Sequence, residues 1–192
     1  MRQFLISSIF FVSLASLSAV SAQSEASAIK AKFLVEGGIE YGGDDLFDAT
    51  TISGAEETIK AGQGSSIGAG GQLEFRDLPY LMFRSTLSYK FVTASAGESK
   101  IRFTRIPLHV SAFYKVTDNF RLGVGAATRF SPKLKGDGAL RDGSYSSPIV
   151  PRFELGFKWI AVTYTPFKYT ADVDGQYSAN CIGVFLSFGF PQ

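Results

Sequence analysis

The chain has 192 residues, a formal net charge of +2 and a single cysteine. So small and scattered a charge gives no indication of a nucleic-acid ligand, and one cysteine excludes an intrachain disulfide and any metal site built on several cysteines. Phenylalanine and tyrosine are abundant, at 18 and 8 residues, but no stretch beyond the N-terminal segment approaches the ~18 consecutive apolar residues of a membrane-spanning helix, so the apolar side chains must be spread over strands.

Residues 1–22 have the three parts of a secretory signal peptide. Arg2 lies in a short basic start, residues 4–17 form an apolar stretch, and the small residues Val20-Ser21-Ala22 end the segment. The apolar stretch is shorter than the roughly 20 residues that a spanning helix requires, which argues against a membrane anchor. We predict cleavage after Ala22, with residues 23–192 forming one domain.

Eight segments of the remaining chain alternate large apolar residues with small, polar or charged ones. This period of two is that of an extended strand, and a membrane barrel needs it because every second side chain faces lipid. The segments span residues 32–41, 65–76, 80–93, 100–114, 120–130, 149–158, 160–169 and 179–190.

Two places depart from regular alternation. In residues 100–114, Ile101 and Phe103 share one parity while Ile106 and Leu108 share the other, and a bulge near residues 105–107 would turn both sets to the lipid. The link between the sixth and seventh segments contains no Gly, Asn or Asp. We place its turn at residues 158–159.

The links between segments alternate in length. Residues 42–64, 131–148 and 170–178 form long or polar links and 94–99 a shorter one, whereas the other three links have two to four residues. Long loops outside and short turns in the periplasm are expected of an outer-membrane barrel. The first long link carries several carboxylates, typical of a solvated acidic surface. Lys133, Lys135 and Arg141 in the third suggest contact with lipopolysaccharide phosphates.

Aromatic residues provide a second test, because amphipathic rings concentrate at the two lipid interfaces of a membrane barrel. A soluble ligand-carrying barrel, the alternative for a secreted chain, would invert the alternation and place its large apolar residues inside. The girdle predicted for the periplasmic strand ends comprises Phe33, Phe75, Tyr80, Tyr114, Phe120, Trp159 and Phe190. The outer ends carry Tyr41, Phe91, Phe103, Phe130 and Tyr169.

The chain resembles the small outer-membrane β-barrel proteins of the OmpA, OmpX and OmpW kind. The resemblance is carried by the stretch Arg105-Ile-Pro-Leu-His-Val-Ser-Ala-Phe-Tyr-Lys115, the turn Thr117-Asp118-Asn119 and the strand Phe120-Arg-Leu-Gly-Val-Gly125. It implies an all-β, eight-stranded antiparallel up-and-down transmembrane β-barrel in the outer membrane of a Gram-negative bacterium. The implied partners are outer-membrane lipids and lipopolysaccharide, periplasmic chaperones and the barrel-assembly machinery. One departure is that Pro191-Gln192 follow the terminal aromatic residue, Phe190.

The inward face of the predicted barrel carries many charges. An eight-stranded barrel is just wide enough for side chains to fill it, so these charges must pair with one another. The predicted lumen network consists of Glu36, Glu40, Glu74, Arg76, Arg84, Lys90, Arg121, Arg129, Arg152 and Glu154. We interpret it as a salt-bridged plug; a charged pathway is the alternative.

Three functions stay open. The preferred one is a non-enzymatic barrel that reinforces the membrane and displays its loops, with no metal, no cofactor and an unknown surface ligand. The second is a narrow channel for small or apolar solutes. The third is a lipid-modifying acyl hydrolase, since His109-Val-Ser111 has the His-x-Ser spacing of the outer-membrane lipid A deacylases, although its flanking residues differ.

Overall fold

The structure is a computed structural model that describes residues 28–50, 56–96, 99–136, 143–171 and 176–191. The signal peptide predicted for residues 1–22 lies outside the described residues. Within those ranges, no helix has the length and apolar character needed to cross a membrane.

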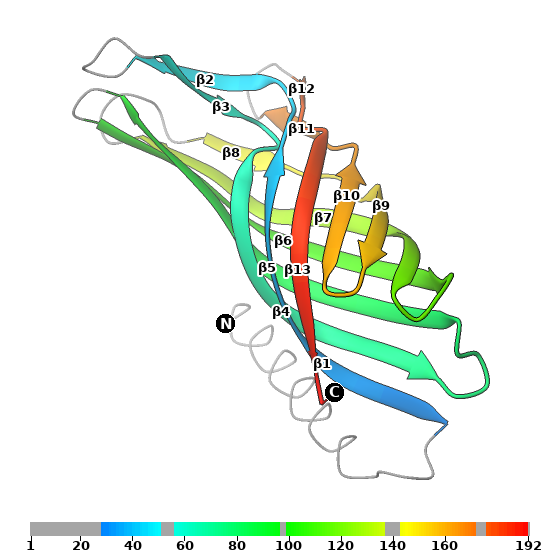
Figure 1. Cartoon of the computed structure of the whole chain (residues 1–192). Helices are drawn as coiled ribbons and strands as arrows, with labels where there is room; N and C mark the ends of the chain where they lie inside the picture. Colours follow the sequence, from blue (N-terminus) through cyan, green and yellow to red (C-terminus); the bar gives the residue numbers. More distant parts are fainter. Residues whose placement is uncertain (1–27, 51–55, 97–98, 137–142, 172–175, 192) are drawn as a thin grey trace, which may run out of the picture.

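Eight strands form a closed antiparallel barrel (Figure 1). Each pairs with the next along the chain, and β1 pairs with β13 from Phe33–Phe190 to Tyr41–Ile182, which closes the sheet. The predicted fold class is therefore confirmed. The barrel strands are β1 (Ile29–Tyr41), β4 (Gly64–Phe75), β5 (Leu81–Ala96), β6 (Ser99–Lys115), β7 (Phe120–Gly136), β9 (Val150–Phe157), β10 (Ile160–Thr165) and β13 (Cys181–Phe190).

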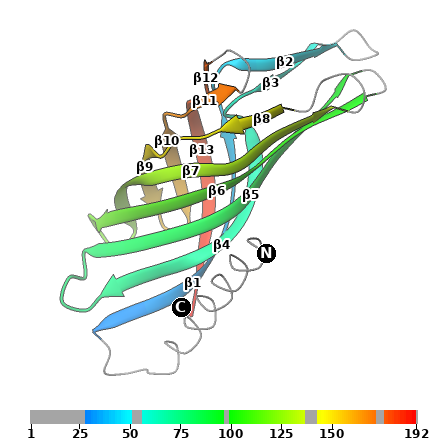
Figure 2. The same cartoon turned by 180° about the vertical axis from the view of Figure 1, so that it is seen from behind.

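Five further strands lie within the links that the sequence predicts as long loops. They are β2 (Asp45–Thr50), β3 (Glu56–Lys60), β8 (Gly143–Ser146), β11 (Lys168–Ala171) and β12 (Gln176–Ser178). Strands β2 and β3 form a hairpin, and β8, β11 and β12 extend the sheet beyond β7. All five gather at one end of the barrel, which we call the outer end; the end with the short links is the turn end (Figure 2). The predicted segment 160–169 is divided between β10 and β11 at Pro166, which has no N–H to donate.

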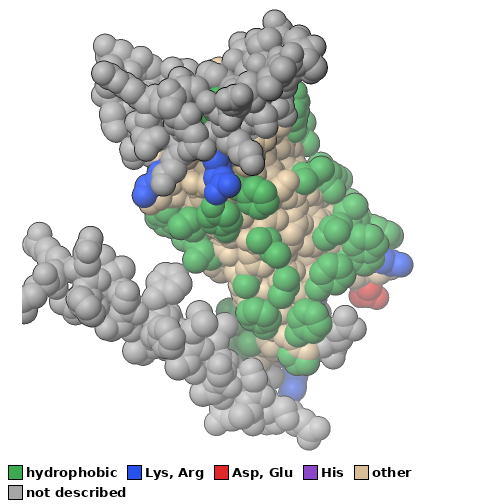
Figure 3. Space-filling model, turned by 90° about the vertical axis from the view of Figure 1, so that its left-hand side faces the viewer, with side chains coloured by type: hydrophobic (Ala, Val, Ile, Leu, Met, Phe, Trp, Pro, Cys, Tyr) green, Lys and Arg blue, Asp and Glu red, His purple; other side chains and the backbone are tan. Residues whose placement is uncertain are grey.

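The alternation of side chains along each strand matches the two sides of the barrel wall. In β13, Cys181 and Phe185 point inward with 2% and 1% exposure, whereas Ile182 and Phe188 point outward with 60% and 44%. The same division holds along β9, β10 and the lower part of β6. One face of the exterior carries a broad band of apolar side chains, with charged side chains at its edges (Figure 3). A secreted barrel of inverted polarity is thereby excluded.

The bulge predicted within residues 105–107 lies on the neighbouring strand instead. In β6, odd-numbered residues point inward without interruption, so that Phe103 and Arg105 are both buried and Ile106 is exposed. The register of β6 against β7 shifts between Thr104–Lys133 and Ile106–Phe130, and Ser131 has a positive φ of 46°. The extra residue is therefore in β7, and Ile101 and Phe103 face the interior rather than the lipid.

The turn predicted at Lys158-Trp159 is present between β9 and β10. Lys158 has a φ of 51°, in the left-handed region that a tight two-residue turn uses. Trp159 is held in place because its carbonyl accepts a hydrogen bond of 2.8 Å from the backbone N–H of Ser187 on β13.

Glycines on the inner face make room for the large side chains that fill the barrel. An added Cβ at Gly123 would meet the Phe113 ring, and one at Gly183 would meet Glu40, Phe185 and Thr163. The interior is thus packed with side chains, as expected for eight strands.

Candidate functional site: the barrel lumen and its outer end

The lumen is filled by layers of polar side chains, beginning near the turn end. Glu74 forms ion pairs with Lys32 at 3.0 Å and with Lys115 at 3.2 Å. Gln72 donates to the same carboxylate and accepts a 2.7 Å hydrogen bond from Nε of Arg84, which links this layer to the next one. The three charged side chains are 19–27% exposed, so the layer is still wetted by solvent.

The middle layer is centred on one carboxylate, Glu154. Three guanidinium groups approach it, with N···O distances of 3.4 Å for Arg121, 3.8 Å for Arg152 and 4.0 Å for Arg84. Arg121 also donates to the Lys158 carbonyl at 2.6 Å. The layer therefore ties β5, β7 and β9 together across the lumen.

His109 and Ser111 lie at this level, both buried and both pointing into the lumen. His109 Nε2 lies 3.4 Å from a guanidinium nitrogen of Arg152, and its ring packs edge-on against Phe185. A catalytic imidazole needs a carboxylate or carbonyl to orient it, whereas here its hydrogen-bonding neighbour is a cation. The pair also faces away from the lipid that a lipid hydrolase would attack.

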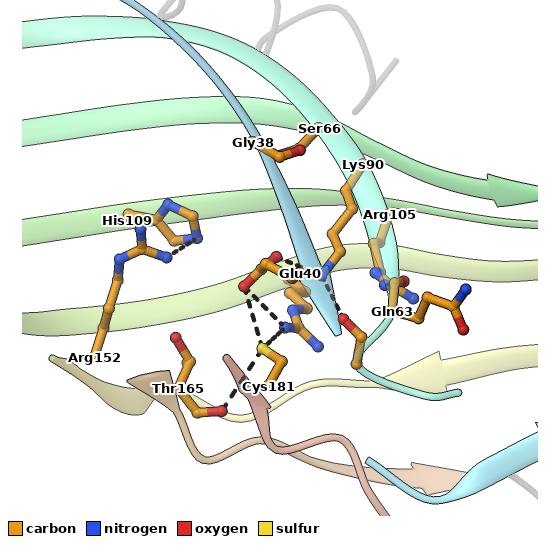
Figure 4. A network of polar contacts seen from close by, with 12 residues as sticks. Gly38, Glu40, Gln63, Ser66, Lys90, Arg105, His109, Arg152, Thr165 and Cys181 are labelled. Atoms are coloured by element: carbon orange, nitrogen blue, oxygen red, sulfur yellow. Dashed lines mark hydrogen bonds and ion pairs between the residues drawn. The ribbon is translucent and has the colours of Figure 1, made fainter. Parts of the chain in front are cut away.

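The upper layer, whose polar contacts are drawn in Figure 4, is the most deeply buried. Glu40 of β1 forms an ion pair with Lys90 of β5, lies 3.9 Å from a nitrogen of Arg129 of β7, and accepts a 3.1 Å hydrogen bond from the thiol of Cys181. The side chains of Glu40, Lys90 and Arg129 are at most 2% exposed. Four strands thus converge on a single carboxylate.

The chain segment that enters β4 closes the top of this layer. The Gly62 carbonyl accepts a 2.7 Å hydrogen bond from Lys90, and the Gln63 carbonyl accepts one from Arg105. Since backbone carbonyls stabilise buried cations, they partly offset the surplus of positive charge in the lumen. That surplus is three buried carboxylates, Glu36, Glu40 and Glu154, against five buried cations, Lys90, Arg105, Arg121, Arg129 and Arg152.

Inward-facing phenylalanine rings stabilise the remaining positive charge. A guanidinium over an aromatic face is attracted by the ring's negative face, more strongly where water is excluded. The guanidinium-to-centroid distances are 4.4 Å for Arg105 over Phe103, 3.7 Å for Arg129 over Phe167, 4.7 Å for Arg152 over Phe185, and 5.2 and 5.8 Å for Arg84 and Arg121 over Phe113.

Above the charges, an apolar cluster fills the outer end of the barrel. We call it the outer cap; it comprises Ile59, Ala61, Ile101, Phe103, Ala127, Phe167 and Ala179, each at most 1% exposed. Val92 and Val150 pack against it. The cap draws on β3, β6, β7 and the links before β4, β11 and β13, so the connections at the outer end fold over the barrel mouth.

The structure places the other predicted lumen residues as follows. Glu36 is buried and accepts a 3.0 Å hydrogen bond from Ser187 across the β1–β13 closure. Arg76 is the exception: it is exposed in the link after β4, because that strand ends at Phe75. Arg105, Lys115 and the partners of Cys181 were not predicted from the sequence. The uninterrupted parity of β6 is the signal that identifies the first two.

Five of the seven predicted girdle residues are exposed at the turn end, either on the lipid-facing side of the barrel wall or in the turns. Tyr80 packs against Tyr114 at 5.6 Å between ring centroids, and Trp159 stacks on Phe188 at 6.4 Å. Phe75 and Phe120 are only partly exposed, and Phe103, predicted for the outer rim, is buried in the outer cap. The exposed members are Phe33, Tyr80, Tyr114, Trp159 and Phe190.

The β2–β3 hairpin is anchored to the barrel through its base. Asp44 accepts a hydrogen bond from the backbone of Ser178 through its carboxylate and donates one to the Ser178 carbonyl through its own N–H, both at 2.7 Å. Lys60 pairs with Asp45 at the start of the hairpin. Arg141, predicted to contact lipopolysaccharide, lies outside the described residues. In the described parts of the chain, no cluster of His, Cys, Asp and Glu is suited to a metal ion.

A closed barrel of even strand number with an apolar exterior is the architecture of integral proteins of the Gram-negative outer membrane, and this chain has it. No protein-family model matches the sequence. No curated protein sequence matches it significantly.

Two solved structures of Ail, the attachment invasion locus protein of Yersinia pestis, are similar in structure. The complex with the heparin analogue sucrose octasulfate shares 8% sequence identity at a TM-score of 0.45, covering 82% of this chain and 97% of Ail. The structure described without that analogue shares 9% identity at a TM-score of 0.43, with the same coverage.

Proposed function

We propose that the chain is a non-enzymatic, non-conducting outer-membrane barrel whose lumen is closed by a salt-bridged plug and whose outer end displays a fixed surface for contact with ligands or neighbouring proteins. The observation that carries this proposal is the succession of two barriers along the lumen. The Glu40–Lys90–Arg129 layer is dry, and the outer cap above it is apolar and equally buried. An ion crossing the barrel would have to separate the charges of this layer and then enter the apolar outer cap.

Display is supported by the way the outer end is built. The base of the β2–β3 hairpin is held by the reciprocal Asp44–Ser178 hydrogen bonds and by the bond from the Ala61 N–H to the Asp44 carbonyl at 2.9 Å. A hairpin held at its base presents its strands without a large ordering cost on binding, which favours recognition.

Conductance in planar lipid bilayers tests the closed lumen. We expect no current steps from the full-length protein. Phe103→Ala with Phe167→Ala removes two cap rings and leaves the Glu40 and Glu154 layers in the lumen, so this variant should also stay closed, with heat-modifiable gel migration verifying that it is folded. The matched control Phe91→Ala with Phe188→Ala removes two lipid-facing rings and should create no conductance. Regular current steps from the unmodified barrel would refute the proposal in favour of a narrow channel.

The hydrolase alternative has its own test. His109→Ala in cells should leave the acylation pattern of lipid A and phospholipids unchanged, because the imidazole faces a guanidinium inside the barrel. A change in that pattern, with the barrel still folded by heat-modifiable gel migration, would restore the enzymatic function.

A further inference from the structure

The lipid-facing surface has a groove of about 570 Å³ at the outer end. It crosses four adjacent strands, β13, β1, β4 and β5, and its lining includes four exposed apolar side chains, those of Ile39, Tyr41, Phe91 and Ile182. Ser65 and Thr93 are among the polar residues that line it. A hollow of this size is unusual on the convex outside of a barrel.

Two features of the strands create the hollow. The first is a small residue in a cross-strand row of large ones. Ser65 lies directly between Ile39 of β1 and Phe91 of β5, and Val184 of β13 is the neighbour of Ile39 on its other side. The second is the late start of β4, which begins at Gly64, while β5 continues past Phe91 to Ala96. The wall is therefore notched above the start of β4.

Exposed cations border this notch. Thr93, on the rim of the groove, is the register partner of Arg102 on β6, and the next outward residue of β6, Thr104, is the partner of Lys133 on β7. Arg102 and Lys133 are exposed and are diagonal neighbours on adjacent strands, a spacing that long side chains bridge. Lys and Arg side chains lie along the upper edge of the apolar surface, below the outer end, in Figure 3.

We propose that the groove and these two cations form a binding site for one molecule of lipid A, the phosphorylated glycolipid of the outer leaflet. One acyl chain fills the groove against Ile39, Phe91 and Ile182, and a phosphate accepts charge-assisted hydrogen bonds from Arg102 and Lys133. Basic residues at headgroup level attract anionic lipids, and an apolar hollow facing hydrocarbon is filled by hydrocarbon. The inference rests on the proposed orientation, with the hairpin end toward the cell surface.

The experiment measures lipid A retained by the full-length barrel in mild detergent, using native mass spectrometry with lipid A, phosphatidylglycerol or phosphatidylcholine as the added lipid. We expect one tightly held lipid A and weaker retention of the two phospholipids. Since each cation near a charged headgroup contributes roughly fivefold in affinity, Arg102→Ala with Lys133→Ala should weaken lipid A binding about 25-fold. Ser65→Leu, which fills the notch, should weaken it with both cations still present.

Two controls keep the result interpretable. Arg76→Ala removes an exposed cation at the turn end and should leave retention unchanged, and the charge-conserving Arg102→Lys with Lys133→Arg should keep most of it. Heat-modifiable gel migration verifies that each variant is folded. Equal retention by the double alanine variant overturns the proposal, and equal binding of phosphatidylglycerol overturns the choice of lipid A. Neither readout depends on conductance, so the closed lumen is tested separately.

Discussion

The interior of the barrel changes character between the level of Glu40 and the level of Phe103. Both levels are dry and built from inward positions, but the lower one consists of two cations that share one carboxylate and the upper one of apolar side chains that exclude water. In the lower level each group depends on its partners, because an unpaired buried charge is costly. In the upper level most of the energy comes from packing, and removing a group costs its transfer energy and the cavity that it leaves.

This difference shows that inward-facing positions of this barrel can be either charged or apolar. Strands β5, β6 and β7 extend toward the outer end, and there their inward positions meet the covering links rather than the lumen. The outer end is thus assembled like the core of a soluble protein, on top of a membrane barrel. The following experiments test this distinction in order of expected effect.

Glu40→Ala should be the most destabilising change. It leaves Lys90 and Arg129 buried without their shared carboxylate, and we expect a loss of about 5 kcal/mol in the free energy of unfolding, measured by urea titration in lipid vesicles. In the double variant Glu40→Ala with Lys90→Met, one of the stranded charges is gone, so part of the stability should return. If the double variant were as unstable as the single one, the charges would not be coupled.

Phe103→Ala should cost about 4 kcal/mol, because it opens a cavity in the outer cap and uncovers the guanidinium of Arg105. Phe91→Ala on the neighbouring strand removes the same ring from the lipid side. It should cost about 2 kcal/mol, the transfer energy without a cavity. The same urea titration measures both, and equal values would contradict the packing of the cap.

Gly70→Ala compares the crowded inside with the open outside. A Cβ at Gly70 would clash with the backbone carbonyl of Ser85, and overpacking of this kind costs about 2 kcal/mol. Gly37 is the matched control, since its added Cβ would have its nearest neighbour at 3.7 Å. Thermal gel-shift midpoints should separate the two variants, and a larger shift for Gly37→Ala would show that the inner face has spare room.

Glu74→Ala should have the smallest effect, about 1 kcal/mol or less, since its ion pairs with Lys32 and Lys115 are partly solvated. Raising the salt concentration should reduce the effect further, whereas the effect of Glu40→Ala should hardly change. A salt response of equal size at both sites would mean that water reaches the upper layer.

Much of the fold was predictable from the sequence because the environment imposes it. Lipid requires an apolar residue at every second position, so the eight barrel strands, and even the Lys158-Trp159 turn, could be located from alternation and loop length. Near Phe103 the rule failed because that part of β6 faces the outer cap, and the bulge was assigned to the wrong strand for the same reason.

The contacts of the candidate site were far less predictable. Alternation assigns Glu40 and Lys90 to a face of the sheet, but their meeting depends on the stagger between β1 and β5, which are not neighbours in the barrel. The stacking of Arg129 on Phe167 likewise joins residues whose positions follow from the closed barrel. Nothing in the sequence around Cys181 indicates a partner for its thiol, and its contact with Glu40 is visible only in three dimensions.

The closure between β1 and β13 has a consequence for biogenesis. The first and last strands of the barrel are partners, and Glu36–Ser187 and Glu40–Cys181 fasten them from the inside. Until the C-terminal strand is delivered, β1 and β10 are left with unsatisfied edges that invite intermolecular pairing. Closure of the barrel therefore depends on these ten residues, and a chain that ended before Cys181 would leave the edges of both β1 and β10 unpaired.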